Sequence, residues 1–319
     1  MEFMDNDLKS IELSELTRSQ LPALHLLQNL GYAYLSPREA LALRGGRADA
    51  VLLESVLLDW LARNNEIQYH GQRYPFSEAN IHTAVQVLKE TLSIGLLRTN
   101  ESIFDLLSLG KSLPQSVNGS LKSFSLRYID WEHPEKNVYH VAEEFAVERR
   151  GSHETRRPDL VLFVNGIPFG VIECKSPDLK DPISQAISQQ IRNQKEDEIP
   201  VLFQYTQLLL AVSGNEAKYG TVGTPAKFWS VWKEESGEFE KAVKATVDQP
   251  LSRSQIQALY DAFPGKHRME AVNSLNLPRV VTAQDRAIYS LCRPERLLEL
   301  AYGFTLFDAG EKKIARYQQ

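Results

Sequence analysis

The feature that most constrains this chain is a pair of short apolar segments separated by the dipeptide Asn165-Gly166. The segment DLVLFV (residues 159–164) precedes the dipeptide, and FGVIEC (169–174) follows it closely. Asparagine and glycine tolerate the positive φ angles that the tightest two-residue hairpin turns require. The sequence therefore predicts an antiparallel hairpin whose two strands are buried within a sheet.

Three charged residues interrupt this apolar hairpin. Asp159 opens the first strand, while Glu173 and Lys175 lie near the end of the second and on one face of it. Two carboxylates brought together repel each other unless a cation lies between them. Mg²⁺ suits such a pair, because it binds carboxylates together with phosphate oxygens and water. We therefore predict that Asp159 and Glu173 bind Mg²⁺ (or Mn²⁺ as a substitute). Lys175 would orient or deprotonate the attacking water, or stabilise charge on a phosphate undergoing hydrolysis.

The register of the hairpin provides a test of this prediction. A regular two-residue turn would pair Asp159 with Ile172 and place Asp159 and Glu173 on opposite faces. Convergence requires a loop with an odd number of residues or a β-bulge, and we predict one of these. The alternative is an exposed hairpin with an ordinary surface Glu–Lys pair. Pro158 before the aspartate, and Ser176-Pro177 after the lysine, favour the metal site.

The rest of the sequence divides into three parts. Residues 1–110 have apolar positions at helical spacing and predict a mainly helical N-terminal part. Residues 111–235 alternate in the manner of strands and hold the hairpin, one helix and a further apolar strand. Residues 236–319 predict a helical connector. The expected fold class is α/β, with a mixed central sheet flanked by helices.

Composition excludes several classes of protein. Cys174 and Cys292 provide neither a disulfide framework nor the spacing of a zinc site. No P-loop motif is present, and no apolar segment approaches the roughly 20 residues of a membrane span. The polar N-terminus does not resemble a secretory signal, so we expect a cytoplasmic protein without a membrane partner. The net charge of -5 argues against a uniformly basic surface but leaves a local basic groove open.

The hairpin residues also resemble a known family. The pattern P-D-x(13)-E-x-K resembles the PD-(D/E)xK nuclease superfamily. The fuller sequence RPDLVLFVNGIPFGVIECKSP (157–177), preceded by YIDWEHPEKNVYHVAEEF (128–145), closely resembles the R subunit of type I restriction enzymes. The similarity extends through residues 189–229 and resumes over 293–319.

This resemblance implies a function. The chain would be the N-terminal nuclease domain of such an R subunit, a type I site-specific deoxyribonuclease that cleaves double-stranded DNA with Mg²⁺. ATP would act only through motor domains that this fragment lacks, and the partners would be DNA and the modification and specificity subunits. Carried over by position, Asp159 and Glu173 would be metal ligands and Lys175 the catalytic lysine.

Three further residues are assigned by the resemblance alone. Gln189 matches the glutamine of a Gln-x-x-x-Tyr element thought to support the site, although Asn193 stands at the tyrosine position. Glu54 resembles an acidic residue that some of these nucleases add to the site. Gln319 would belong to the start of an adenine-recognising motif. A solvated helix face is the alternative interpretation of Gln189.

Four arginines lie just before Asp159 in the sequence. They could contact DNA phosphates or form a solvated loop: Arg149, Arg150, Arg156 and Arg157. Two other functions also remain open. One is a stand-alone repair or RecB-like nuclease of the same superfamily. The other is a non-catalytic docking module whose hairpin carboxylates are structural.

Overall fold

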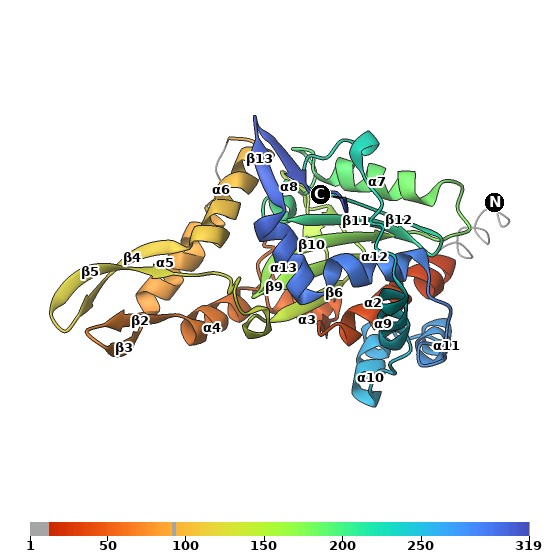
Figure 1. The fold of residues 1–319 in the computed structure, drawn as a ribbon, viewed down its shortest axis with the longest axis horizontal. Coiled ribbons are helices and arrows are strands. Elements are labelled where there is room, and N and C mark those ends of the chain that lie inside the picture. Colours follow the sequence, from red (N-terminus) through yellow and green to blue (C-terminus); the bar gives the residue numbers. More distant parts are fainter. Residues whose placement is uncertain (1–12, 91–93, 319) are drawn as a thin grey trace.

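The computed structural model describes residues 13–90 and 94–318, and within them a mixed six-stranded sheet forms the centre of the molecule (Figure 1). Its strands in spatial order are β1 (Ala33–Leu35), β6 (Tyr139–Glu143), β9 (Leu160–Val164), β10 (Ile167–Cys174), β11 (Leu208–Ser213) and β12 (Glu216–Gly220). The pairs β1–β6 and β10–β11 are parallel, and the other three pairs are antiparallel. The predicted α/β class is confirmed.

Helices cover both faces of the sheet. One face carries α7 (Pro182–Asn193), and the other carries α2 (Leu21–Asn29) and α12 (Ala283–Cys292), as Figure 1 shows. Every residue of β9 and β10 is buried, which explains why their sequences are apolar almost throughout. The end of β10 is therefore a costly place for a charged side chain.

The register of the β9–β10 hairpin has the predicted irregularity. Beside the turn Ile167 pairs with Val164, but farther along Ile172 pairs with Leu160, because a β-bulge lies between Pro168 and Gly170. The extra residue advances one strand by one position and reverses which side chains share a face. The bulge thereby places the residue after Ile172 opposite the residue before Leu160.

The hairpin turn is fixed by its surroundings. Asn165 and Gly166 both have positive φ, 52° and 83°, as a type I′ turn requires. The buried Asn165 side chain accepts a hydrogen bond from the Val138 N–H at 2.8 Å. The Leu53 N–H donates to the Gly166 carbonyl at 2.8 Å, which attaches the next helix to the turn.

Replacing Gly166 with alanine should therefore destabilise the fold strongly. The new Cβ would lie 2.5 Å from the Leu53 carbonyl oxygen, at a φ that side chains rarely adopt. We expect a loss of about 2–3 kcal/mol in the free energy of unfolding. Denaturant unfolding of Gly166→Ala measures this loss. Gly119→Ala is the control, because its Cβ would meet nothing within 4 Å at a similar φ of 80°.

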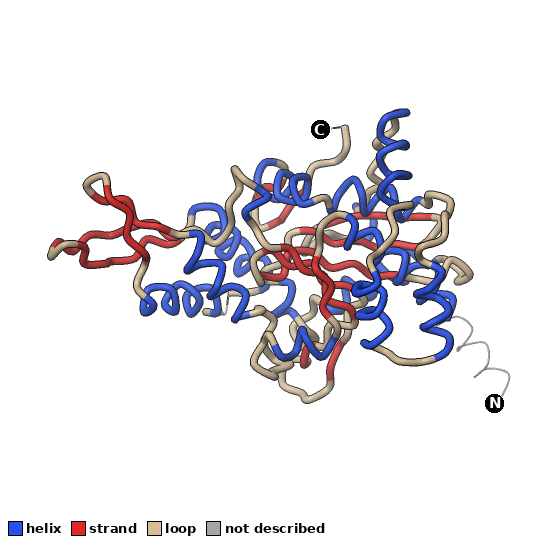
Figure 2. Tube along the Cα trace, turned by 90° about the horizontal axis from the view of Figure 1, so that it is seen from below, coloured by secondary structure: helices blue, strands red, loops and turns tan. Residues whose placement is uncertain are grey.

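The N-terminal part contains more strand than the sequence predicts. Two hairpins and two helices form an arm that extends away from the sheet in both views (Figures 1 and 2). From the N-terminal part, the arm takes α4 (Glu54–Asn64), β2 (Glu66–Tyr69), β3 (Gln72–Pro75) and α5 (Glu78–Lys89). Its second hairpin, β4 (Lys111–Val117) and β5 (Ser120–Leu126), follows residue 110, where strands were predicted. The N-terminal part also contains α3 (Pro37–Ala42) and α6 (Leu96–Leu109). The prediction of a mainly helical part missed β1, β2 and β3, whose three or four residues are too few to display a period of two.

The segment before Asp159 is also more ordered than a polar loop. It forms the short antiparallel pair β7 (Val147–Glu148) and β8 (Thr155–Arg156). Single-turn elements punctuate the neighbouring connections: η2 (Pro134–Lys136), α8 (Pro200–Phe203) and η3 (Ala226–Phe228).

The C-terminal part is helical, as predicted, up to residue 303. Its helices are α9 (Gly237–Val247), α10 (Arg253–Ala262), α11 (Lys266–Ser274), α12 and α13 (Pro294–Gly303). The expected helical ending is wrong, because β13 (Thr305–Asp308) and β14 (Glu311–Ile314) form a hairpin. This hairpin buries Lys312, whose ammonium donates to Asn100 Oδ1 at 2.8 Å. Gln319 lies outside the described residues.

None of the helices in the described part of the chain is both long and apolar enough to cross a lipid bilayer.

Candidate active site

Asp159 and Glu173 meet at the end of the hairpin remote from its turn. The register that pairs Leu160 with Ile172 continues to place Asp159 opposite Glu173. Asp159 Oδ2 accepts a hydrogen bond from the Cys174 N–H at 2.6 Å, which fixes its carboxylate against β10. Both side chains are buried, with 7% and 0% of their surfaces exposed. The bulge thus brings two buried carboxyl groups together.

Only one of the two oxygens of the Glu173 carboxyl group has a hydrogen-bond partner in the described structure. Its Oε2 accepts a hydrogen bond from Gln189 Nε2 at 2.7 Å, whereas Oε1 is buried without a partner in the described structure. Burial raises the pKa of Glu173 well above its ordinary value, and the charge of Asp159 raises it further. A buried oxygen without a partner is energetically costly, and coordination to a cation would satisfy it.

Lys175 lies beside this carboxyl pair. Its ammonium nitrogen is 3.7 Å from Asp159 Oδ2 and 3.6 Å from Glu15 Oε1. Burial alone would lower the pKa of Lys175, but the charges of Asp159, Glu173 and Glu15 raise it above its ordinary value. Lys175 therefore acts as a fixed positive charge rather than as a proton acceptor at neutral pH.

Glu15 is a site residue that the sequence did not reveal. It precedes a π-helical turn, η1 (Leu16–Gln20), which leads directly into α2. Its Oε2 accepts from the Ser176 N–H at 3.4 Å, while Oε1 faces Lys175. Burial raises the pKa of Glu15, and the charge of Asp159 adds to this effect while Lys175 opposes it. π-Turns inside helices frequently occur at functional sites.

Glu144 is a second carboxylate that the sequence did not assign. It follows β6, and its N–H donates to the Asp159 carbonyl at 2.9 Å. Its φ of 48° is rare for a residue with a side chain and marks a constrained position. Burial, and then the charge of Asp159, raises the pKa of Glu144 to about 7. Four acidic residues therefore surround the end of the hairpin: Glu15, Glu144, Asp159 and Glu173.

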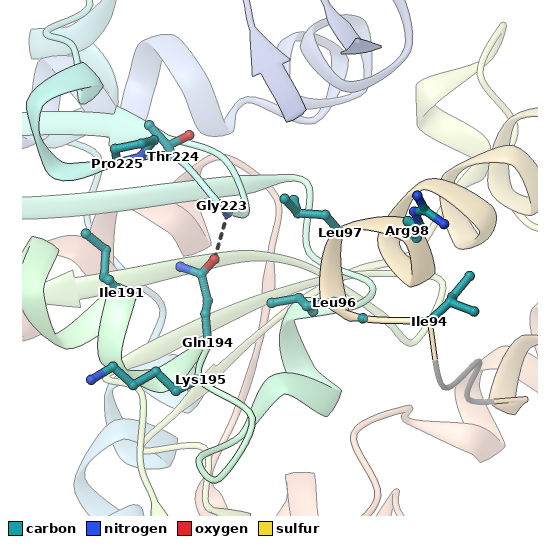
Figure 3. A pocket seen from close by; sticks show the side chains of 11 residues that line it. Ile94, Leu96, Leu97, Arg98, Ile191, Gln194, Lys195, Gly223, Thr224 and Pro225 are labelled. Atoms are coloured by element: carbon teal, nitrogen blue, oxygen red, sulfur yellow. Dashed lines mark hydrogen bonds between the residues drawn. The ribbon is translucent and has the colours of Figure 1, made fainter. Parts of the chain in front are cut away.

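Helix α7 is held so that Gln189 faces the site. Gln190 Nε2 donates to the carbonyls of Val171 and Leu210 at 3.2 Å, which ties the helix to the sheet. At its C-terminal end, Gln194 Oε1 accepts from the Gly223 N–H at 2.8 Å (Figure 3). The buried Asn193 accepts from Arg192. The pocket in Figure 3 is largely apolar and is not lined by the carboxylates, so it is separate from the candidate site.

The structure does not bring Glu54 to this site. Glu54 begins α4 beside the Gly166 turn, at the opposite end of the hairpin, and forms an ion pair with Lys89. Strand geometry separates that end from Glu173 by roughly 20 Å. The resemblance that pointed to Glu54 was to an acidic residue on an early helix; Glu15 is an early acidic residue that lies beside the hairpin instead.

Replacing Glu54 with glutamine should consequently leave the site intact. For the nuclease that the resemblance implies, we expect DNA cleavage within about twofold of the unsubstituted protein. We also expect a stability loss below about 1 kcal/mol from the partly exposed ion pair with Lys89. Cleavage rates of Glu54→Gln and Glu15→Gln, measured side by side, test this assignment. A large loss with Glu54→Gln and none with Glu15→Gln would reverse it.

The four arginines fall into two groups. Arg156 makes a bidentate ion pair with Glu198 at 2.5 and 2.9 Å, and Arg149 lies 3.3 Å from the same carboxylate. Arg150 is exposed and lies 3.4 Å from Glu196. Arg157 is exposed and forms no ion pair with the other described residues. Arg157 is therefore the arginine best placed to meet a phosphate near Asp159.

The residues present fit a divalent cation. Within residues 13–90 and 94–318, no group of three or more His, Cys, Asp or Glu side chains is arranged so that it could by itself hold a metal ion. Mg²⁺ needs no such cluster, because it commonly takes one or two carboxylates and completes its shell with water and phosphate. Asp159 and Glu173 supply two carboxyl groups, and the unpartnered Glu173 Oε1 provides a free ligand atom.

Comparison with known proteins places the chain in a family. The family described as the N terminus of the type I restriction enzyme R protein matches residues 12–228. The chain belongs to this R protein family. The matched residues include the whole of the site described above, from Glu15 to Gln189. The family resemblance that the hairpin sequence suggested is confirmed.

Two relatives match nearly the whole of this R protein chain. A protein of Methanocaldococcus jannaschii, named for the endonuclease subunit of type I restriction enzyme MjaIXP, is 30% identical over 93% of the chain. The type I restriction enzyme HindI endonuclease subunit of Haemophilus influenzae is 24% identical over 93%. The chain covers 26% and 25% of their lengths, so it spans about a quarter of each relative. Their names support a restriction endonuclease role.

Proposed function

We propose that this chain is the Mg²⁺-dependent nuclease domain of a type I restriction R subunit, which cleaves double-stranded DNA. The observation that carries the proposal is the bulge that sets Asp159 opposite Glu173 and leaves a Glu173 oxygen without a partner. As in the relatives, the domain would form part of a longer polypeptide. That polypeptide would carry an ATP-driven motor and assemble with modification and specificity subunits.

An open groove beside the site suits a DNA backbone. It runs from Lys175 along α7 and is lined by Lys175, Lys180, Asp181, Ser184, Gln185, Ser188, Gln189 and Arg192. Three of these residues are cationic and one is acidic, and the hydroxyl and amide groups can also donate to phosphate oxygens. The groove supplies a local positive surface in a chain whose net charge is -5.

Each residue of the site would have a different role in phosphodiester hydrolysis. Asp159 and Glu173 would hold the cation, which supplies charge to polarise the phosphate and to activate water. Gln189 fixes the orientation of Glu173 through its 2.7 Å hydrogen bond. Lys175 keeps its proton, so it would stabilise the negative charge that develops on the phosphate. The Glu15 carboxylate, 3.6 Å from the Lys175 ammonium, balances the positive charge of Lys175.

Substitution in the assembled enzyme tests the proposal. Asp159→Ala, Glu173→Ala and Lys175→Ala should each abolish DNA cleavage while ATP hydrolysis continues, because the motor would be a separate part of the polypeptide. Cleavage that survives all three substitutions would favour the docking-module alternative. A stand-alone repair or RecB-like nuclease would instead require the 319-residue chain alone to cleave DNA efficiently.

A further inference from the structure

A buried ion pair joins the C-terminal helices to the central sheet beside the site. Arg268 of α11 donates to both oxygens of Glu143 at the end of β6, at 2.7 and 2.6 Å. The two side chains are 6% and 0% exposed. Tyr34 also donates to Glu143 at 2.6 Å. Glu143 is therefore a fully satisfied carboxylate with a fixed orientation.

Gln20 connects this ion pair to the next residue of the chain. Its Nε2 lies 3.3 Å from Glu143 Oε1 and 3.3 Å from Glu144 Oε1, so its two N–H groups bridge the two carboxylates. The fixed Glu143 determines which end of the amide faces Glu144. If Glu143 lost its orientation, the Gln20 amide would lose the contact that aims its donor at Glu144.

Glu144 is held beside Asp159 by few contacts. Its backbone N–H donates to the Asp159 carbonyl, and its positive φ places it in the left-handed region directly after β6. Within the described part of the chain, the Glu144 carboxylate accepts a side-chain hydrogen bond from Gln20 alone. The position of the Glu144 carboxylate near Asp159 therefore depends on Gln20, and through it on Glu143 and Arg268.

We propose that Arg268 is a positioning residue of the nuclease site. Through Glu143 and Gln20, it holds the Glu144 carboxylate where it adds to the negative field that binds the divalent cation. This inference rests on the proposed function, because it assumes a cation at Asp159 and Glu173. It also makes α11, far along the chain from the hairpin, part of the structure that sets the cation affinity.

Mn²⁺ binding to the chain tests this inference directly. Gln20→Met keeps the volume of the side chain and the Arg268–Glu143 pair but removes the bridge, and Arg268→Gln removes the pair itself. Each variant should bind Mn²⁺ about tenfold more weakly in calorimetry, the size of loss typical for residues that orient metal ligands. The double variant should bind Mn²⁺ no more weakly than Arg268→Gln does, because both residues act on Glu144 through the same chain of contacts. In the assembled enzyme, raising the Mn²⁺ concentration should restore the cleavage rate of both variants.

Arg279→Gln is the matched control. Arg279 makes a bidentate pair with the buried Asp285 at 2.6 and 2.7 Å in the same C-terminal part, but this pair has no contact with Glu143 or Glu144. The Arg279→Gln substitution should leave the Mn²⁺ affinity within about twofold of that of the unsubstituted chain. The inference would be overturned if Arg279→Gln bound Mn²⁺ as weakly as Arg268→Gln does, or if Gln20→Met bound Mn²⁺ with unchanged affinity. If Arg268→Gln does not fold, the Mn²⁺ affinity of Gln20→Met alone tests the inference.

Asp159→Asn separates this inference from the proposed function. If Asp159→Asn abolishes Mn²⁺ binding while Gln20→Met binds normally, only the positioning role of Arg268 is wrong. If Asp159→Asn binds Mn²⁺ as the unsubstituted chain does, the metal site itself is wrong.

Discussion

Replacing Glu173 with glutamine is expected to abolish DNA cleavage and, at the same time, to stabilise the chain in the absence of metal. Glutamine has nearly the shape of glutamate but no charge, so it removes a ligand from the cation and a buried repulsion from the fold. Cleavage should fall by about 10³-fold or more. In EDTA, the melting temperature should rise by about 2 °C, which corresponds to a gain of about 1 kcal/mol.

The stabilisation should depend on pH with a definite sign. Burial and Asp159 raise the pKa of Glu173 in the folded chain above its ordinary value of 4.5. A group of this kind favours folding fully only below its unfolded-state pKa, and this contribution is lost as the pH rises through the folded-state pKa. Glutamine does not titrate. The difference in melting temperature between Glu173→Gln and the unsubstituted chain should therefore be larger near pH 8 than near pH 5.

Glu54→Gln is the control for this prediction, because Glu54 is partly exposed and paired with Lys89. Its removal should leave the cleavage rate within about twofold of that of the unsubstituted protein and should not stabilise the chain. If Glu173→Gln lowered the stability at every pH, Glu173 would be a satisfied structural residue and the hairpin carboxylates would favour the docking-module interpretation.

The second large effect is expected from Lys175→Met, which should separate metal binding from catalysis. The Lys175 ammonium lies 3.7 Å from Asp159 Oδ2, so it competes with a cation for the same carboxylate. Removing it should raise the affinity for Mn²⁺ in calorimetry. Cleavage should nevertheless fall by about 10³-fold, because the positive charge that stabilises the transition state is lost.

Lys218→Met is the matched control for this separation. Lys218 is a partly buried lysine of β12 that lies 3.2 Å from Glu216, away from the hairpin carboxylates. Its removal should change neither the Mn²⁺ affinity nor the cleavage rate. Loss of both metal binding and cleavage in Lys175→Met would show that Lys175 supports the local structure rather than the reaction.

The central part of the site could be predicted from local sequence. Asn165-Gly166 specified the turn, the apolar runs specified the strands, and the alternation of side chains required a bulge if Asp159 and Glu173 were to meet. The bulge between Pro168 and Gly170 fulfils that requirement. These inferences succeeded because each depends on residues within one hairpin.

The outer part of the site could not be predicted in the same way. Glu15 and Glu144 reach the hairpin through tertiary packing, and neither lies in a pattern with a spacing that chemistry dictates. The π-turn after Glu15 and the positive φ of Glu144 also have no signature in the sequence. For the same reason Glu54, chosen by resemblance to an early acidic residue, lies at the wrong end of the hairpin.

Anomalous diffraction from crystals soaked in Mn²⁺ tests the central claim most directly. A peak is predicted between the carboxyl groups of Asp159 and Glu173, in contact with the Glu173 oxygen that now has no partner. A fully soaked crystal with no peak at this position, or with Mn²⁺ bound only elsewhere, would contradict the assignment of this hairpin as the metal site of a nuclease.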